Sequence, residues 1–209
     1  MSQAPPTDPA QDPGVGLMLA YQAGDEAAFD ELVHTYSGQV YALLTRFLGQ
    51  ASAREDLVQE VFLRVIRSRR RYQATARFST WLYRIVFNLC VNERERRGGH
   101  ELSLERTGRS DEDDPRGELE DEGAPRPEAG LEREDVVQAV RSAIGALPEN
   151  QRMALILAKY QEQSHAEIAL VLGSSEKAVK SLVHRARETL RERLRPFLDT
   201  QFASGELSA

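Results

Sequence analysis

Apolar residues in the first third of this chain recur at spacings of three and four, which is the pattern of amphipathic α-helices. A short helix is expected over residues 17–23. A long helix should follow from Asp25, a residue type that favours helix N-termini, to Gly49. The Ser-Ala-Arg-Glu sequence at 52–55 has the form of a capping box and predicts a third helix that runs through residue 66.

The fourth predicted helix carries the only tryptophan of the chain, Trp81. Its apolar stripe extends from residue 78 to residue 89, at helical spacing. Ser79 or Thr80 can cap its start, and the Gly98-Gly99 pair is expected to stop it. No stretch alternates with period two, so the N-terminal half is predicted to be entirely helical.

The same region is strongly basic. Between Val61 and Arg97 there are ten arginines and two glutamates. Basic groups attract phosphate and flat rings can stack on bases, so the pattern favours a nucleic-acid surface. An amphipathic core helix with a solvated charged face explains it about as well, and Trp81 in particular fits a core position better than a stacking platform.

Helical periodicity returns in the C-terminal half, over residues 131–147. Pro148 is suited to the start of the next helix, and Ser164 with Glu167 forms another capping box. The short helix that this box opens should end at Gly173. All-α structure is therefore expected throughout.

The last two helices have helix-turn-helix spacing. Gly173 would permit the sharp turn, and the second helix is expected from Glu176 to about Pro196, with Val179 and Leu182 facing the first. Basic residues dominate this second helix: Lys177, Lys180, Arg185, Arg187, Arg191, Arg193 and Arg195, against Glu188 and Glu192. Such a helix typically enters a DNA major groove; an ordinary α-hairpin with a charged face is the alternative.

Charge divides the chain into parts. The 209 residues are 41% hydrophobic and carry a net charge of −6, but glycine, proline and acidic residues gather over 98–130. A segment so polar cannot bury enough surface to fold, so we expect a flexible acidic linker between two small helical domains, 16–97 and 131–196. Whether the linker is passive or active stays open. Residues 1–15 should be a disordered lead, and 197–209 a tail.

Several classes of site are not supported. Cys90 is the only cysteine, and the four histidines show no ligand spacing with acidic partners, so neither a disulfide framework nor a metal is expected. There is no phosphate-binding glycine loop, no dinucleotide fingerprint and no nucleophile–base pair, which predicts no catalytic residue, cofactor or small-molecule substrate. Without a signal-peptide pattern or an apolar run of membrane-spanning length, we expect a cytoplasmic protein with no membrane insertion.

Two separate segments resemble one protein family. EDLVQEVFLR at 55–64, FSTWLYRI at 78–85 and then Asn88 resemble the core-binding and promoter-melting domain of bacterial sigma factors, notably the small extracytoplasmic-function (ECF) class. LPENQR at 147–152, followed by the helix-turn-helix and HRAR at 184–187, resembles the C-terminal domain of that class.

The resemblance covers about residues 16–97 and 131–195, in the order of the family, and nothing between them resembles the central domain of larger sigma factors. The chain departs from the family at Asn92, where an acidic residue is usual. It departs again at Lys177-Ala178, where a Gly-Thr pair is usual, and at Leu182, which is often basic. The C-terminal departures affect how bases would be read, not the expected fold.

The resemblance implies that the third helix docks on the clamp helices of the largest subunit of core RNA polymerase. The implied docking residues are Asp56, Gln59, Glu60 and Phe62. An acidic and amide edge beside an apolar stripe suits a basic coiled coil, whereas a solvated helix face is the alternative. Contact with the polymerase flap and control by an anti-sigma factor are implied as well.

The resemblance also implies that the basic helix takes the −10 promoter element as a single strand. Asn88 would lie at a pocket for an unstacked base, because a carboxamide offers a donor and an acceptor to a base edge. The implied −10 surface consists of Gln73, Ala74, Thr75, Ala76, Arg84, Asn88 and Asn92.

The second helix of the helix-turn-helix would read the −35 element as duplex DNA. Helical spacing places Lys180, Ser181, His184 and Arg185 on one exposed face. Lys180 and Arg185 can address base acceptors or phosphates, and spacing alone does not separate the two.

These features together predict a non-catalytic sigma factor that binds core RNA polymerase, directs it to promoters through −10 and −35 elements and helps to melt the −10 DNA. A free-standing helix-turn-helix regulator of a duplex operator is the alternative, but it would leave the N-terminal motif without a purpose. A recombinase or nuclease would need carboxylates clustered near the DNA face, and here they gather in the linker.

Overall fold

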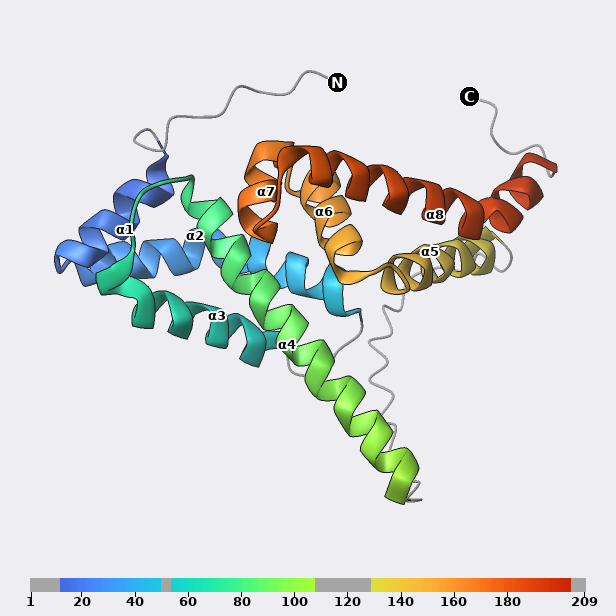
Figure 1. Cartoon of the computed structure of the whole chain (residues 1–209), viewed down its shortest axis with the longest axis horizontal. Helices are drawn as coiled ribbons and strands as arrows, with labels where there is room; N and C mark the ends of the chain where they lie inside the picture. The colour runs from blue at the N-terminus through green and yellow to red at the C-terminus, as the bar shows by residue number, and fades with distance from the viewer. Residues whose placement is uncertain (1–11, 50–53, 108–128, 204–209) are drawn as a thin grey trace.

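The computed structural model describes residues 12–49, 54–107 and 129–203, and within these ranges all regular structure is helical (Figure 1). The all-α prediction is confirmed. The helices are α1 (Pro13–Ala23), α2 (Glu26–Leu48), α3 (Arg54–Ser68), the short 3₁₀ turn η2 (Arg69–Arg71), α4 (Phe78–Thr107), α5 (Ala129–Gly145), α6 (Glu149–Tyr160), α7 (His165–Leu172) and α8 (Glu176–Ala203).

Helices α1 to α4 form an N-terminal group around one core. The side chain of Asp25 caps α2 by accepting from the backbone N–H of Ala27 at 3.0 Å, as the sequence predicted. Fully buried side chains fill the interior of this group: Leu32, Leu43, Leu44, Phe47, Val61, Phe78 and Leu82. Tyr36 on α2 and Phe78 on α4 meet at 4.9 Å between ring centroids, which fixes the crossing of these two helices.

Asp12 organises the start of two helices. Its carboxylate accepts from the backbone N–H of Gly14 at 2.8 Å and from that of Phe78 at 3.0 Å. Ser79 and Thr80 were expected to cap α4, but both are buried within its first turn. The expected disordered lead, 1–15, is therefore wrong from Asp12 onward, because this carboxylate satisfies helix donors that would otherwise lack partners.

Two predicted helix ends are also wrong. Helix α4 continues through Gly98-Gly99 to Thr107, and α8 continues through Pro196 to Ala203. A helical glycine costs only about 1 kcal/mol, which neighbouring helix formers can offset. Pro196 removes one backbone hydrogen bond, at a cost of about 3 kcal/mol, yet α8 continues past it. The capping box at 52–55 lies largely outside the described residues, as does most of the linker, 108–128.

Helices α5 to α8 form a C-terminal group that contains the predicted helix-turn-helix. Ser164 and Glu167 make the reciprocal capping box, with the backbone N–H of Ser164 donating to Glu167 at 2.8 Å. Gly173 has a φ of 61°, in the left-handed region that a glycine adopts without strain, and so allows the turn into α8. Val179 and Val183 face inward from α8.

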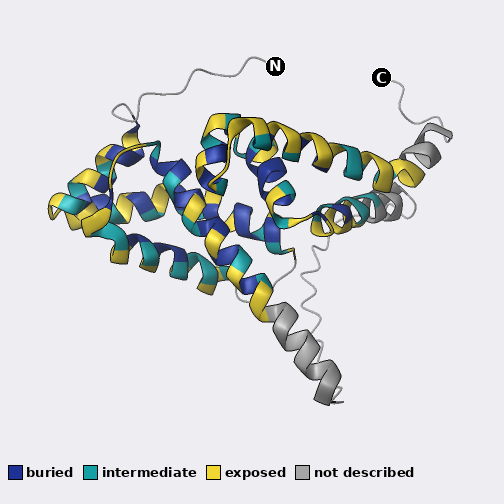
Figure 2. Cartoon of the chain, viewed as in Figure 1, coloured by how far each residue is buried: buried dark blue, intermediate teal, exposed yellow. Residues whose placement is uncertain are grey.

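The two groups pack on each other: α7 lies against α4, and α6 against α2 (Figure 1). Their buried side chains form one continuous cluster, in which Met153 and Ile156 of α6 and Ile168 of α7 join Phe78 and Leu82 of α4. Figure 2 shows the dark-blue buried positions running through both groups. The sequence predicted two helical units but gave no sign of this shared core.

Candidate functional site

The face of α3 that points away from the core combines acidic and amide groups. Asp56 and Gln59 are exposed on it. Glu60 is partly covered and holds Arg64 at 2.8 Å and Arg67 at 3.5 Å. The hydrogen bond from Arg64, against a smaller opposing effect of burial, lowers the pKa of the Glu60 carboxyl, so this group is ionised near neutral pH.

Phe62 does not belong to this face. Its side chain is only 6% exposed and packs edge-on against Phe29, with ring centroids 6.4 Å apart. The exposed apolar residues of α3 are instead Leu63, at 44%, and Ile66, at 41%. The expected docking residues did not include these two, because α3 carries more apolar positions than one buried stripe can hold. This excess of apolar residues in the sequence could have indicated that some of them are exposed.

A shallow hollow lies where α2 and α3 meet. It is lined by Ser37, Gly38, Tyr41, Glu55, Val58 and Gln59. The guanidinium of Arg54 stands 5.9 Å from the ring centroid of Tyr41 at this edge. The hollow continues the exposed face of α3, so a helix or a side chain of a partner could rest on both helices at once.

The polar loop before α4 is held at its start by buried aromatic rings. Tyr72 is buried and meets Trp81 edge-on at 4.9 Å, and burial raises the pKa of the Tyr72 hydroxyl to about 12. Gln22 on α1 donates to the backbone oxygens of Arg69 and Tyr72 at 2.9 and 3.3 Å. The loop side chains then project outward: Gln73, Ala74 and Thr75 are exposed, and Ala76 is partly so.

Three polar residues follow this loop along one line of α4. Arg84, Asn88 and Asn92 are all exposed and are spaced by four, so they stack on one face of the helix. Trp81 packs against the core cluster, with Phe78 at 5.6 Å, which supports its interpretation as a core residue. The structure thus brings six of the seven predicted −10 residues to exposed positions on one loop and one helix face, with Ala76 partly covered.

The predicted −35 residues share the outer face of α8. Lys180, Ser181, His184 and Arg185 are exposed, while Val183 and Ala186 between them are buried. The amine of Lys180 lies 3.3 Å from the carboxylate of Glu176, an exposed pair of the kind that contributes little to stability. Lys180 is therefore free to exchange this partner for DNA at little cost.

Among the described residues, no cluster of His, Cys, Asp or Glu side chains could hold a metal ion. A search of the same residues finds no helix with the length and hydropathy of a membrane span. Cys90 is buried, and burial raises the pKa of its thiol to about 12, so it lacks the thiolate character of a reactive cysteine.

Comparison with known proteins assigns the chain to a family. Residues 32–99 match the family described as Sigma-70 region 2, and residues 137–190 match that described as Sigma-70, region 4. The RNA polymerase sigma-H factor of Pseudomonas aeruginosa is 32% identical over 182 residues, which is 87% of this chain and 94% of the relative. The chain belongs to the ECF class of bacterial sigma factors.

Other relatives agree. The ECF sigma-E factor of Escherichia coli K12 is 32% identical over 187 residues, with 87% of this chain and 94% of the relative covered. A solved structure of CnrH in complex with the cytosolic domain of CnrY has a TM-score of 0.62 at 26% identity and covers 88% of this chain and 99% of that one. The sigma factor RpoE of Bartonella quintana, solved with the anti-sigma factor NepR, shares the fold, with a TM-score of 0.59 at 22% identity over 80% of this chain and 96% of that one.

The ECF sigma factor described here therefore directs RNA polymerase to promoters, with region 2 in the N-terminal group and region 4 in the C-terminal group. Region 2 contains the faces of α3 and α4, and region 4 contains the face of α8.

Proposed function

We propose that this sigma factor docks on core RNA polymerase through α3, takes the −10 element as a single strand on α4 and its preceding loop, and reads the −35 element as duplex on α8. One observation carries the assignment. Arg84, Asn88 and Asn92 form an exposed line directly beyond a loop that also projects outward, on the most arginine-rich part of the chain.

The docking surface that we propose on α3 is Asp56, Gln59 and Glu60 with Leu63 and Ile66 in place of Phe62. The apolar pair supplies surface that leaves water on binding, and the acidic and amide groups select a basic partner. The clamp helices of the largest polymerase subunit are the proposed partner, and the flap is proposed for region 4. Since RpoE of B. quintana was solved with an anti-sigma factor, we propose that such a factor also regulates this chain.

The melting role rests on capture of an unpaired base. An unstacked base needs a group that hydrogen-bonds its edge, and the Asn88 carboxamide can both donate and accept. Arg84, one turn earlier, is placed to hold the phosphate backbone of the same strand. Capture offsets part of the unpairing energy of a few kcal/mol, so the chain would melt DNA by binding, as a non-catalytic initiation subunit in the cytoplasm.

Purified chain, core polymerase and a promoter fragment test this function together. The proposal expects the chain to co-purify with core polymerase and to cause transcripts that start at one position of a duplex template. A chain that binds duplex DNA but neither joins the polymerase nor yields such transcripts would instead be a free-standing regulator.

A further inference from the structure

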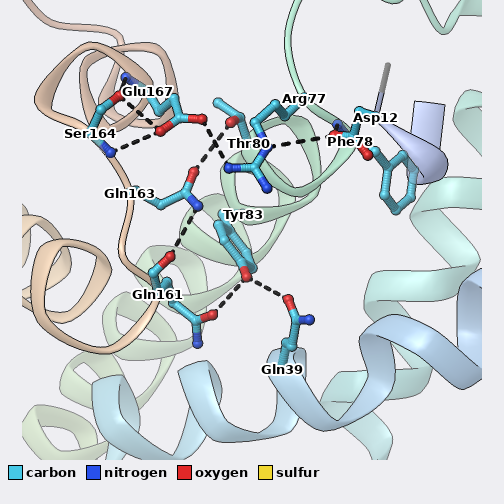
Figure 3. A network of polar contacts seen from close by, with 10 residues as sticks. All are labelled: Asp12, Gln39, Arg77, Phe78, Thr80, Tyr83, Gln161, Gln163, Ser164 and Glu167. Carbon is cyan, nitrogen blue, oxygen red and sulfur yellow. Dashed lines mark hydrogen bonds and ion pairs between the residues drawn. The ribbon is translucent and has the colours of Figure 1, made fainter. Parts of the chain in front are cut away.

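Helix α1 contacts both η2 and α4 and holds the two ends of the loop between them (Figure 1). At the start of α1, the Asp12 carboxylate accepts from the backbone N–H of Phe78, the first residue of α4, at 3.0 Å (Figure 3). Near the end of α1, the side chain of Gln22 donates to the backbone oxygens of Arg69 and Tyr72 at 2.9 and 3.3 Å. The rise of a helix places these two attachments about 15 Å apart.

Further contacts keep α1 in place at both of these ends. A β-carbon built on Gly14 would stand 2.9 Å from the Cβ of Phe78, so the backbone of α1 lies directly against the start of α4. At the other end, the guanidinium of Arg69 pairs with Glu26 at 2.7 Å and stands 4.0 Å from the ring centroid of Tyr21. Helix α1 and the turn η2 therefore fix each other's position.

The loop between the attachments is short and consists partly of alanine. Within it, the backbone N–H of Thr75 donates to the carbonyl oxygen of Gln73 at 2.9 Å, which closes a tight turn inside the loop. Ala74 and Ala76 have no hydrogen-bonding group in their side chains, so a base edge could bond these residues only through their backbone. Where that backbone lies depends on how the ends of the loop are held.

We propose that α1 is a brace for the −10 loop, in which Gln22 and Asp12 are positioning residues for base selection. The inference rests on the proposed function, because it needs residues 73–76 to contact bases of the −10 strand. Asp12 is only 7% exposed, and the amide nitrogen of Gln22 is already bonded to two backbone oxygens. Each side chain acts on the strand through the backbone that it holds.

Such a brace affects which base is preferred more than how tightly the strand is bound. Phosphate contacts, such as the one proposed for Arg84 on α4, carry no sequence information and do not pass through the loop. Hydrogen bonds to a base edge need donor–acceptor distances of about 2.7–3.2 Å, and a loop displaced by about 1 Å falls outside this range. Loss of the brace should therefore lower base preference while most of the affinity remains.

The variant Gln22→Met tests the brace, because methionine has a similar length and lacks both N–H donors. Holoenzyme made with the variant or the parent chain is mixed with single-stranded DNA that has a randomised central stretch, and the bound molecules are sequenced. Sequences that core polymerase alone enriches are subtracted. At the most selective position, base preference should fall by about three- to tenfold, the effect of losing one or two such hydrogen bonds.

Two further quantities should hardly change in Gln22→Met. Affinity for the unselected pool should stay within about twofold of the parent, since it depends mainly on phosphate contacts. Capture of core polymerase should be equal, because the proposed docking surface lies on α3. Leu19→Ala is the control: this side chain is 43% exposed on the same helix, and its loss should leave base preference at the parent value.

Base preference in Gln22→Met equal to that of the parent would overturn the brace. A purely structural role for Gln22 would lower the unfolding midpoint of the chain and its capture of core polymerase while base preference is retained, and that result would overturn the brace as well. If the parent holoenzyme shows no base preference beyond that of core polymerase alone, the proposed function fails instead.

Discussion

The Tyr83 hydroxyl lies 2.7 Å from the side-chain oxygen of Gln161 in region 4. It lies at the same distance from the side-chain oxygen of Gln39 on α2, within region 2. A hydroxyl has one hydrogen and two lone pairs, so it donates to one of these oxygens, and the other carboxamide can turn over to present its amino group to a lone pair of the hydroxyl. Tyr83 thus bonds one carboxamide in each region.

This symmetry gives a matched pair of variants. Gln161→Ala removes the bond between regions and should shift the free chain toward forms in which the two regions have separated by about two- to tenfold, the effect of a bond contributing roughly 0.5–1.5 kcal/mol. Gln39→Ala removes a bond to the same hydroxyl but should leave the regions together. Energy transfer between dyes on α3 and α8 measures the separation; equal values for the two variants would show that the Tyr83–Gln161 bond does not hold the two regions together.

The helices were predictable from the sequence because their signals are local. Asp25, Pro148, the Ser164–Glu167 box and Gly173 each act within a turn or two of the chain, and each is found where the pattern placed it. The cap of α4 was not predictable in this way. Asp12 reaches the Phe78 N–H across 66 positions of sequence, and no local pattern reports such a contact.

The candidate site also combines features that local sequence patterns predict with features that they do not. Exposure of Lys180 and Arg185 follows from helical spacing and was foreseen, whereas Asn88 was assigned through the family resemblance. The docking role of Phe62 also came from the resemblance, and the structure buries this side chain with the apolar stripe of α3. The contact between α4 and the α6–α7 segment was not foreseen for another reason: it is made of Thr, Tyr, Gln, Arg and Glu side chains, which in a sequence are typical of an exposed surface.

The proposed docking surface on α3 predicts that one residue of this helix contributes to stability and another to polymerase docking. Phe62→Ala should lower the free energy of unfolding by about 3–5 kcal/mol, because it empties a buried aromatic site. Ile66→Ala should change it by no more than about 0.5 kcal/mol, yet weaken capture of core polymerase by about fivefold or more, a loss of at least ~1 kcal/mol. Urea denaturation and a pull-down with core polymerase measure the two quantities. Normal docking by Ile66→Ala would remove the apolar pair from the interface.

On α8 we expect Arg185 to contact a phosphate and Lys180 to contact a base. Arg185→Ala should then flatten the dependence of log affinity on log salt by about 0.9 without relaxing sequence preference. Lys180→Ala should lower discrimination at one −35 position by roughly 1–3 kcal/mol. Holoenzyme affinity for matched and mismatched −35 sites over a salt series checks both. If Lys180→Ala flattens the salt dependence and Arg185→Ala lowers discrimination, the two roles are exchanged. Unchanged affinity and slope in both variants would show that this face of α8 does not contact the DNA.

Asn88 gives a test of melting itself. Because a residue that captures an unstacked base acts only after the duplex opens, Asn88→Ala should leave core polymerase binding intact and strongly reduce transcripts from a duplex promoter. On a template with a pre-opened −10 bubble the deficit should shrink, since the unpairing work is already done, but some loss should persist because the base contact is gone. Asn92→Ala, one turn along the same proposed −10 surface, tests whether the effect on melting is particular to Asn88. Abortive transcripts from both templates, with core binding measured separately, distinguish the outcomes.

A fall in core binding in step with activity would show that Asn88 has a structural role. Equal deficits on the two templates would show that Asn88 contacts DNA but has no part in melting.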